Sequence, residues 1–450
     1  MSLLLFAKRN FGRLPYPLGW MAAQLPFGAR PGLAGVYNAR RRDIASVASM
    51  STEQRQAFVF ARVQPLAEWA YRHVPFYADL YAAAGIDPAR FRRFEDLMTL
   101  PVVTKKMLQA VPLDHRSSPD GPRSLENTGG SSGQPLDFHI APSSIPHEWA
   151  HMHHIWQRVG YKTRHLKLVF GGRSTISDGI EYDAVRHHYA VDIYAGWEAA
   201  AEKIAALPSY IETRFLHGYP SAIFDFILWL DHNRHPLLDR LRGEVRGMLL
   251  GSEFPAPDAR EQVEQLLNCS SVSWYGHTER SLLAYERSEK TVYCPFQSYG
   301  FAEAVSGEDG RRLIGTSYYN RVSPFIRYDT GDLVEDETKD GLMQSFRVAK
   351  GRSGEFIRDN AGNKIFLTGL IFGRHHRIFD YCTHLQVSQE EMGRATIHVI
   401  PKDILPPGWE DMFDASNVRV DFAFSVEARP YRTAAGKIPL LIKSEKMTTQ

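Results

Sequence analysis

Residues 215–232 read Phe215-Leu-His-Gly218, then Tyr219, then Pro220-Ser-Ala-Ile-Phe-Asp-Phe-Ile-Leu-Trp-Leu-Asp-His232. The first four residues predict a short strand, and Pro220 stands where the first turn of a helix favours proline. A second strand follows at Gly247–Leu250, before Gly251, and a second helix follows at residues 258–267. This alternation of strand and helix predicts a parallel or mixed sheet layered with helices.

The same alternation extends upstream of this stretch. In chain order the pattern predicts a helical segment over residues 50–94 interrupted at Pro75, a strand at 136–140, a helix over 143–160 capped at Ser143 or Ser144, a strand at 166–170 and a helix at 197–207. Residues 114–135 are rich in Ser, Gly, Pro and Asn, which predicts a loop.

Downstream the pattern changes twice. Short strands with Gly and Asp turns dominate residues 290–350, and beyond Gly351 the chain has strands of its own at 395–400 and 418–426. We therefore predict an α/β (mixed α+β) fold with a boundary near residue 350. Residues 1–350 would form a large domain of layered β-sheets and helices, and residues 351–450 a small α+β domain.

Composition excludes several classes of protein. Hydrophobic residues make up 44% and charged residues 23% of the 450, which excludes long disorder and a fibrous protein. Lys and Arg number 53 against 51 Asp and Glu, so charge gives no reason to expect a nucleic-acid partner. The three cysteines, Cys269, Cys294 and Cys382, form no CxxC pair. Their spacing argues against a disulfide framework or a cysteine-rich zinc site and favours a reducing cytoplasm.

The first thirty residues are apolar but do not predict a transmembrane segment. The run Met1-Ser-Leu-Leu-Leu-Phe6 is shorter than a spanning helix or a signal-peptide core requires. Residues 14–31 are apolar and contain four prolines. Two interpretations stay open for this stretch: it rests on a membrane surface, or it packs on a partner.

A Gly/Ser segment, Asn127-Thr-Gly-Gly-Ser-Ser-Gly-Gln-Pro135, carries the first chemical pattern. Its glycines allow backbone N–H groups to approach an anion closely, and Thr128, Ser131 and Ser132 add hydroxyl donors. This is what a triphosphate cradle requires. It is not the Walker pattern, because no Lys-Ser/Thr pair follows the last glycine. A flexible connector would have the same composition.

Four further segments each fit either a role in a ligand site or an ordinary surface turn. Trp274-Tyr-Gly-His-Thr-Glu279 places a carboxylate that could bind Mg²⁺ after an aromatic-Gly turn. Arg327-Tyr-Asp-Thr-Gly-Asp332 places an Asp that could accept hydrogen bonds from two neighbouring hydroxyls, as on a ribose. Gly351-Arg352 stands at the predicted boundary, and Arg432-Thr-Ala-Ala-Gly-Lys437 places a Lys on a Gly loop. Taken singly, each also fits a surface turn.

In this order and at these spacings, the five segments together resemble the core motifs of the adenylate-forming superfamily of acyl-CoA synthetases and luciferases. Within it the chain is similar to the phenylacetate-CoA ligase branch, including its CapK-like members. Four further features carry that similarity: Val74-Pro-Phe-Tyr77, His217-Gly-Tyr-Pro-Ser221, Asn320 and Pro324-Phe-Ile-Arg-Tyr328.

The resemblance implies an enzyme that uses ATP and Mg²⁺, with a mobile C-terminal lid. It implies Lys437, Glu279 and Arg352 as catalytic residues, with Glu279 as the metal ligand. The implied ATP and AMP contacts are Thr128, Gly129, Gly130, Ser131, Ser132, Gly133, Gly251, Ser252, Glu253, Tyr275, Gly276, His277, Thr278, Asp332 and Arg352. The acyl pocket would include His217, Tyr219 and Trp274.

The activity implied is adenylation of a carboxylic acid, with an aromatic acid as one candidate, followed by transfer to a thiol, foremost that of CoA. An alternative passes the acyl group to a carrier protein or an amine in polysaccharide or natural-product biosynthesis. A third interpretation, from another class, is a catalytically silent ligand-binding protein on the same fold. Gly354 departs from the family pattern, which often has an acidic residue two positions after the Gly-Arg arginine.

Overall fold

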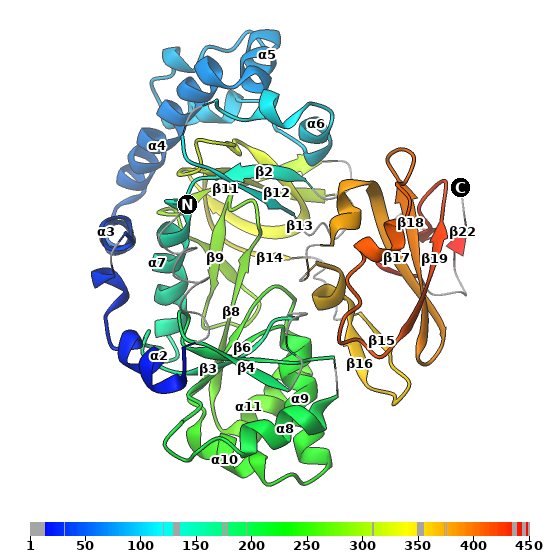
Figure 1. Ribbon diagram of the computed structural model, residues 1–450. Coiled ribbons are helices and arrows are strands. Elements are labelled where there is room, and N and C mark those ends of the chain that lie inside the picture. Colours follow the sequence, from blue (N-terminus) through cyan, green and yellow to red (C-terminus); the bar gives the residue numbers. More distant parts are fainter. Residues whose placement is uncertain are drawn as a thin grey trace.

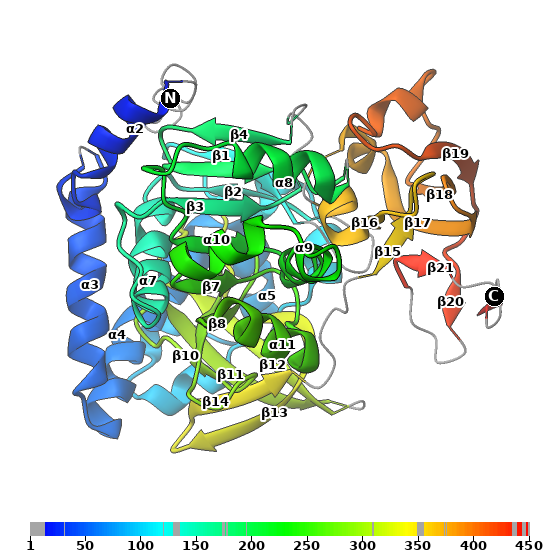
Figure 2. The ribbon, with the colours of Figure 1, turned by 90° about the horizontal axis from the view of Figure 1, so that it is seen from below.

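The computed structural model describes residues 14–30, 32–119, 121–128, 136–172, 176, 179–194, 196–307, 310–348, 355–372, 374, 376–433, 439–442 and 447–448. The chain has a large region up to residue 348 and a C-terminal region from residue 355 (Figure 1). The C-terminal strands lie on one side of the large region, and the first helices lie on the opposite side (Figure 2).

The helices of the large region begin at residues that favour helix starts. Ser51 and Gln54 form a capping box before α4, and prolines stand in the first turn of α5, α9 and α11. Bounds are α2 Tyr16–Ala23, α3 Ala34–Ala48, α4 Thr52–His73, α5 Pro75–Ala83, α6 Lys105–Gln109, α7 Ser144–Gln157, α8 Trp197–Ala205, α9 Pro220–His232, α10 Leu237–Glu244 and α11 Pro257–Leu267.

Twelve strands form the central sheet, in the order β11-β12-β13-β14-β10-β9-β8-β7-β6-β3-β5-β4. Their bounds are β3 Lys167–Phe170, β4 Ile180–Asp183, β5 His188–Val191, β6 Phe215–Gly218, β7 Gly247–Leu250, β8 Ser270–Gly276, β9 Leu283–Glu286, β10 Tyr293–Pro295, β11 Gly300–Gly307, β12 Gly310–Ser317, β13 Tyr328–Lys339 and β14 Leu342–Val348. Strands β5, β3, β6, β7 and β8 run parallel, whereas β4 and the strands from β9 onward pair antiparallel.

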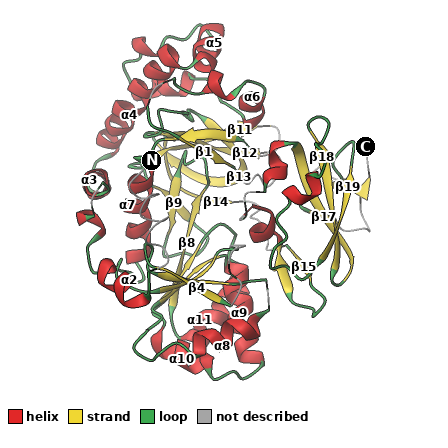
Figure 3. Ribbon diagram, in the orientation of Figure 1, coloured by secondary structure: helices red, strands yellow, loops and turns green. Residues whose placement is uncertain are grey.

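Strand β8 therefore joins a parallel half-sheet to an antiparallel one. Helices cover both faces of the parallel half, as parallel strands require. On one face Leu168, Leu216 and Leu250 pack in the cluster formed with α8 to α11. On the other face Phe215 and Leu249 pack in the cluster that contains Ile155 and Trp156 of α7. Figure 3 shows helices at both ends of the large region, with the strands between them.

Helices α4, α5 and α6 cover the antiparallel end of the large region. Val59, Tyr77 and Leu108 pack with Phe138 of the hairpin β1 Ser124–Asn127 and β2 Asp137–Ile140, and with Phe325. The Tyr77 hydroxyl donates to the Pro324 carbonyl at 2.8 Å and accepts from Ile326 N at 3.1 Å. Segments about 250 residues apart in the sequence are thereby joined in one core.

The C-terminal region has small sheets of its own. Its strands are β15 Phe356–Arg358, β16 Lys364–Phe366, β17 Cys382–Glu391, β18 Arg394–Pro401, β19 Asp421–Val426, β20 Arg432–Thr433, β21 Leu441–Ile442 and β22 Met447–Thr448. The hairpin β15–β16 and the pair β20–β22 stand apart from a four-stranded sheet ordered β19-β18-β17-β21.

One apolar cluster joins the two regions. Ile357, Phe366 and Leu370 belong to the same cluster as Leu168 and Phe226 of the large region. Polar contacts accompany it. Lys364 forms an ion pair with Asp225, the Arg374 guanidinium lies 4.4 Å from the centre of the Tyr194 ring, and Asn417 Nδ2 donates to the Ile176 carbonyl at 3.0 Å.

The predicted mixed α/β fold is confirmed, and most predicted elements lie where expected. Phe215–Gly218, Pro220–His232 and Gly247–Leu250 have the predicted bounds. Several details were wrong. The predicted loop at residues 114–135 contains strand β1, because Ser124–Asn127 pair with β2, and strand β4 was not predicted. Ser143 is the N-cap of α7, but no side-chain hydrogen bond caps that helix, since the φ and ψ of Ser143 are already helical.

Candidate active site

The candidate site lies at the carboxyl ends of β6, β7 and β8. Ligands in open α/β sheets bind at this edge, where successive strands deliver their following loops to one place. Tyr219 follows β6, the segment Gly251–Ser252–Glu253 follows β7, and His277 to Glu279 follow β8. Asp332 lies in β13, which reaches the same place through the antiparallel half of the sheet.

Glu279 has a buried carboxylate held by a neighbouring strand. Its Oε1 accepts a hydrogen bond from the Tyr328 hydroxyl at 2.9 Å, and Tyr328 begins β13. Burial, and next the Glu279 charge, raise the pKa of Tyr328, so this phenol stays protonated and donates. The bond uses one of the two carboxylate oxygens of Glu279.

Asp332 is joined to the other aromatic residue of the same motif. The Tyr275 hydroxyl donates to Asp332 Oδ2 at 2.5 Å, and the Tyr275 ring packs against Phe346 at 5.2 Å between centroids. Burial, and next the Asp332 charge, raise the pKa of Tyr275 well above its usual value. Gly331 has a φ of +80°, the left-handed turn that a glycine adopts without strain, and it precedes Asp332 directly.

The segment after β7 is shaped by close packing. Gly251 packs closely against the Trp274 indole. A Cβ at residue 251 would stand 2.2 Å from Cζ2 of that ring. Ser252 has a φ of +71°. The Glu253 carboxylate then turns back to Ser221, whose backbone N and hydroxyl donate to Oε2 at 3.2 and 2.5 Å.

Two of the three predicted acyl-pocket residues are in contact. The rings of His217 and Trp274 stack at 5.9 Å with 27° between their planes, and Trp156 of α7 lies 5.0 Å from His217. His217 Nδ1 donates to the Leu249 carbonyl at 3.0 Å, which leaves Nε2 as an acceptor. Burial, followed by the charge of Lys167, lowers the pKa of His217 to about 4. The imidazole is neutral at physiological pH.

Tyr219, the third predicted pocket residue, is half-buried where the C-terminal region meets the site. A Cβ at Gly369 would stand 3.1 Å from the Tyr219 ring and 2.8 Å from the Tyr194 hydroxyl. The predicted adenine-side residues also differ in exposure. Gly276 and Thr278 are exposed, whereas His277 is half-buried and its Nε2 lies 2.8 Å from the Ser281 hydroxyl oxygen.

Thr128 closes the base of the Gly/Ser segment. Its N–H donates to the Leu136 carbonyl at 3.1 Å, and its hydroxyl accepts from Leu136 N at 2.8 Å. This pairing continues the β1–β2 ladder and brings residues 128 and 136 together. Gly129, Gly130, Ser131, Ser132 and Gly133 follow Thr128 but lie outside the described residues, as do Arg352 and Lys437.

Known proteins resemble the chain in sequence and in fold. No protein-family model matches it. Phenylacetate-coenzyme A ligase of Escherichia coli (strain K12) is 25% identical over 308 residues, 64% of this chain and 68% of that protein. Solved structures of 2-hydroxyisobutyryl-CoA ligase share 15% identity. In the postadenylation state with R3-HIB-AMP the TM-score is 0.53, covering 88% of this chain and 91% of that one. In the thioesterification state with 2-HIB-AMP and CoA it is 0.55, covering 88% and 90%.

The chain is similar in sequence to one ligase of the adenylate-forming superfamily, and its fold is that of solved ligases of the same kind. This confirms the family predicted from the five motifs. The solved structures support the fold alone, and the sequence relationship supplies the link to phenylacetate-CoA ligase. The roles of single residues in this chain stay predictions.

The described residues are compatible with Mg²⁺ at Glu279. Within the described ranges, no group of three or more His, Cys, Asp and Glu could hold a metal on its own. Mg²⁺ does not require such a cage, because it is commonly bound by one or two carboxylates together with substrate phosphates and water. Glu279 offers a buried carboxylate of this kind, at the sheet edge that Asp332 also reaches.

The motifs did not predict the ion pairs that hold the site's loops. Arg280, next to Glu279, forms an ion pair with Glu148 of α7 at 2.5 Å. Arg327, next to Tyr328, forms a buried ion pair with Glu303 and donates to the carbonyls of Met98 and Leu100. Arg280 adjoins Glu279 and Arg327 begins a motif of its own, but nothing in the sequence indicated their acidic partners.

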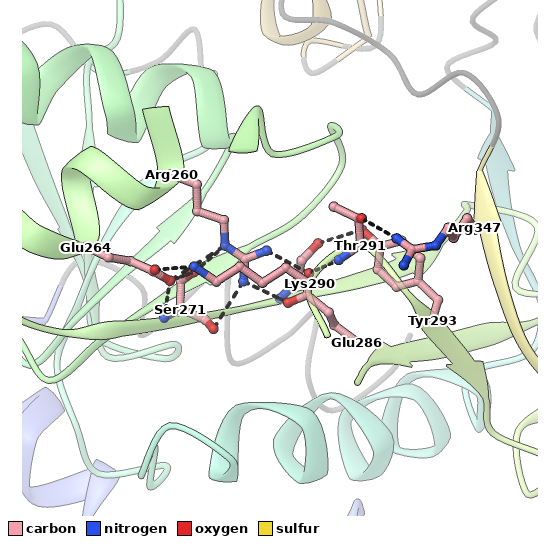
Figure 4. Close-up of polar contacts among 9 residues, drawn as sticks. Arg260, Glu264, Ser271, Glu286, Lys290, Thr291, Tyr293 and Arg347 are labelled. Carbon is pink, nitrogen blue, oxygen red and sulfur yellow. Dashed lines mark hydrogen bonds and ion pairs between the residues drawn. The ribbon is translucent and has the colours of Figure 1, made fainter. Parts of the chain in front are cut away.

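A second buried network fixes the strands behind the site (Figure 4). Arg260 of α11 is almost fully buried and binds both oxygens of Glu286 on β9, at 2.6 and 2.7 Å. Arg260 Nε also donates to the Ser271 hydroxyl of β8 at 2.7 Å. Bidentate pairing satisfies the buried charges and fixes the geometry. The network thereby holds α11 against β8, the strand that carries Trp274 and leads into His277 to Glu279.

Proposed function

We propose that this chain adenylates a carboxylic acid with ATP and Mg²⁺ and then transfers the acyl group to a thiol, foremost that of CoA. The observation that carries the proposal is the convergence of Glu279, the Tyr275–Asp332 pair and Glu253 at one sheet edge, beside the stacked His217 and Trp274. The relationship to phenylacetate-CoA ligase supports the same chemistry.

In the first step a carboxylate oxygen of the substrate attacks the α-phosphorus of ATP. A P–O bond forms, the P–O bond to pyrophosphate breaks, and pyrophosphate carries away the electron pair. Mg²⁺ bound at Glu279 would neutralise phosphate charge in this step. The substrate carboxylate is itself the nucleophile, so the chain needs no nucleophilic side chain.

The described side chains position the nucleotide and the acid. Tyr275 holds Asp332 through one carboxylate oxygen, which leaves Oδ1 for the ribose hydroxyls. Tyr328 holds Glu279 in the same way. The neutral His217 and the Trp274 indole provide a flat, mostly apolar wall beside the site. Such a wall fits an aromatic or other planar acid, and this is our proposal for the acyl pocket.

We further propose that residues 351–450 act as a lid that carries Lys437. A lysine cation at the α-phosphate would stabilise the charge that develops there, which is the largest catalytic contribution in sites of this type. Arg352 would hold the ribose together with Asp332. Between the two steps the lid would rotate, as in enzymes whose conformational steps limit turnover.

ATP–pyrophosphate exchange over a panel of aromatic and aliphatic acids tests the first step. We expect exchange with at least one acid, and we expect Lys437→Ala to lower its rate about 100-fold or more, as the loss of a charge-stabilising group does. Circular dichroism and the melting temperature should match the wild-type chain. Exchange at the wild-type rate in Lys437→Ala would remove that residue from the mechanism.

The acceptor is tested separately. Formation of an acyl-CoA thioester from the activated acid supports CoA as acceptor. Exchange without a thioester would instead favour a carrier protein or an amine. No exchange with any acid, together with no nucleotide-dependent rise in melting temperature, would leave the silent ligand-binding interpretation.

A further inference from the structure

Helix α2 (Tyr16–Ala23) has its large apolar side chains on the outside. Gly19 and Ala23, one turn apart, are its buried residues. Leu18, Trp20 and Met21 are 48%, 46% and 64% exposed, and Leu25 just beyond the helix is 44% exposed. A surface helix that only completes a core has the reverse arrangement, with its apolar stripe turned inward.

The packing of α2 shows that this arrangement is fixed. A Cβ at Gly19 would stand 2.1 Å from the Tyr182 hydroxyl of β4, so only a glycine allows the helix to lie this close to the strand. The Tyr16 ring packs on Tyr182 at 5.5 Å between centroids. Rotating α2 to bury Trp20 or Met21 would require breaking these contacts. The exposed apolar face, which we call the α2 face (Leu18, Trp20, Met21 and Leu25), is therefore a built surface.

Basic groups adjoin this face. A cavity of about 410 Å³ lies between the turn Phe27–Ala29, α3 and the segment after α7, and Pro26 next to Leu25 lines it. The charged residues that line it are Arg41 and Lys162, and none of its lining residues is acidic. Across residues 1–42 the sequence has seven Lys and Arg and no Asp or Glu, the first acidic residue being Asp43.

Helix α2 lies where docking would not cover the C-terminal region. Helices α2 and α3 lie on the side of the large region opposite the C-terminal strands (Figures 1 and 2). No described helix is both long and apolar enough to cross a bilayer. At 1.5 Å per residue α2 is about 12 Å long, so it can lie in an interface but cannot span one.

We propose that the α2 face, together with the cavity holding Arg41 and Lys162, docks this protein on the surface of an anionic lipid bilayer. The aliphatic side chains and Met21 would enter the boundary between headgroups and acyl chains, and the Trp20 indole suits the interface because it is apolar with one polar N–H. The two cations would face lipid phosphates. A cavity lined by two cations and by no acidic residue favours the phosphates of an anionic membrane over a neutral protein partner.

Vesicle co-sedimentation of the full chain tests this. The probes are vesicles of phosphatidylcholine alone and vesicles of phosphatidylcholine mixed with phosphatidylglycerol. We expect binding to the mixed vesicles that weakens with added salt. Trp20→Glu combined with Met21→Glu should lower the partition coefficient about tenfold or more, because it replaces two membrane-facing apolar groups with charges. The matched control is Met392→Glu with Ile404→Glu, at side chains 60% and 94% exposed in the C-terminal region, and it should bind as the wild type does.

A second pair of variants separates the contribution of the two cations to vesicle binding from that of the apolar side chains. Arg41→Gln with Lys162→Gln should weaken binding to the mixed vesicles about fivefold for each cation and leave binding to phosphatidylcholine unchanged. The control is Arg90→Gln with Arg394→Gln, at two exposed arginines in exposed ion pairs elsewhere. All variants should keep the wild-type circular dichroism spectrum and pyrophosphate exchange in solution.

Two results would overturn the proposal. One is equal binding by the wild type and Trp20→Glu/Met21→Glu. The other is no vesicle binding together with a dimer, seen by light scattering, that the same variant dissociates, because a second copy of the chain would then cover the α2 face. Neither result depends on whether the chain adenylates an acid.

Discussion

At the scale of single residues, the contact between Gly251 and Trp274 decides the shape of the site. We predict that Gly251→Ala turns the indole away from His217, because the new Cβ would stand 2.2 Å from the ring. The specificity constant for the acid in pyrophosphate exchange should fall about tenfold or more, since small displacements of positioning groups have effects of this size.

The chain offers a matched control for this substitution. Gly243 lies in α10, and an added Cβ there would have no atom within 4 Å, so Gly243→Ala should keep full activity. It should leave stability unchanged or raise it slightly, since alanine is favoured over glycine in a helix. If Gly251→Ala and Gly243→Ala had equal specificity constants, the Trp274 wall would not bind the acid.

Single residues show what the sequence could and could not predict. Glu279 and Asp332 were predicted from motif order, and the structure brings both to one sheet edge. Their partners Tyr328 and Tyr275 were each inside a predicted motif, but no spacing rule pairs a strand end with a residue 49 or 57 positions away. Lys167, buried beside Tyr161 with a pKa lowered to about 7 by burial and next by Arg30, had no signal at all.

At the scale of elements, helix α7 couples stability to pH. His147, His151 and His153 are all buried on it, and burial is the largest cause that lowers the pKa of each, for His151 to about 3. His151 Nδ1 donates to the His147 carbonyl at 2.9 Å, and Nε2 accepts from Ser298 at 2.9 Å. The folded protein thus keeps this imidazole neutral.

Below pH 6.5 the unfolded chain binds protons that the folded chain does not, so the free energy of unfolding falls as pH falls. For His151 we predict a loss of about 2 kcal/mol between pH 7 and pH 5, recovered above pH 7, and for His147 and His153 a loss in the same direction. Calorimetric melting across this range measures it. His151→Asn should reduce the fall in the free energy of unfolding between pH 7 and pH 5 by the contribution of one histidine. The matched control, His232→Asn at an exposed residue, should leave that fall as it is in the wild type. A melting temperature that is constant from pH 7 to pH 5 would contradict this account of α7.

Elements with strong local signals were predicted best. The strand at Phe215–Gly218 and the helix beginning at Pro220 had both an apolar pattern and a Gly or Pro that marks an element end. Their bounds are as predicted. Strand β4 was missed because, among the described strands, it pairs with β5 alone, and its residues Ile180–Asp183 carry two charges in four. Pairing with a neighbouring strand, rather than local propensity, decides such a strand.

At the scale of the whole molecule, the two regions share one apolar cluster. Ile357, Phe366 and Leu370 lie in it with Leu168 and Phe226, and the Lys364–Asp225 ion pair lies at the same contact. The change of pattern near residue 350 predicts a boundary, but a pattern cannot show which apolar side chains meet across it. A lid that rotates about residues near 351 would have to break this contact and form another.

This contact leads to a prediction about the large region alone. A chain ending at residue 350 would expose the apolar surface that Ile357, Phe366 and Leu370 cover, at a cost of about 2 kcal/mol for each large side chain no longer buried. We expect that chain to bind a hydrophobic dye, to melt several degrees below the full protein and to keep weak nucleotide binding. The control is a full-length chain carrying Lys364→Met, which loses the ion pair to Asp225 but keeps the apolar contact, and which should melt close to the wild type. A truncated chain as stable as the full one and free of bound dye would show that the apolar contact is dispensable, as a lid that separates fully from the large region requires.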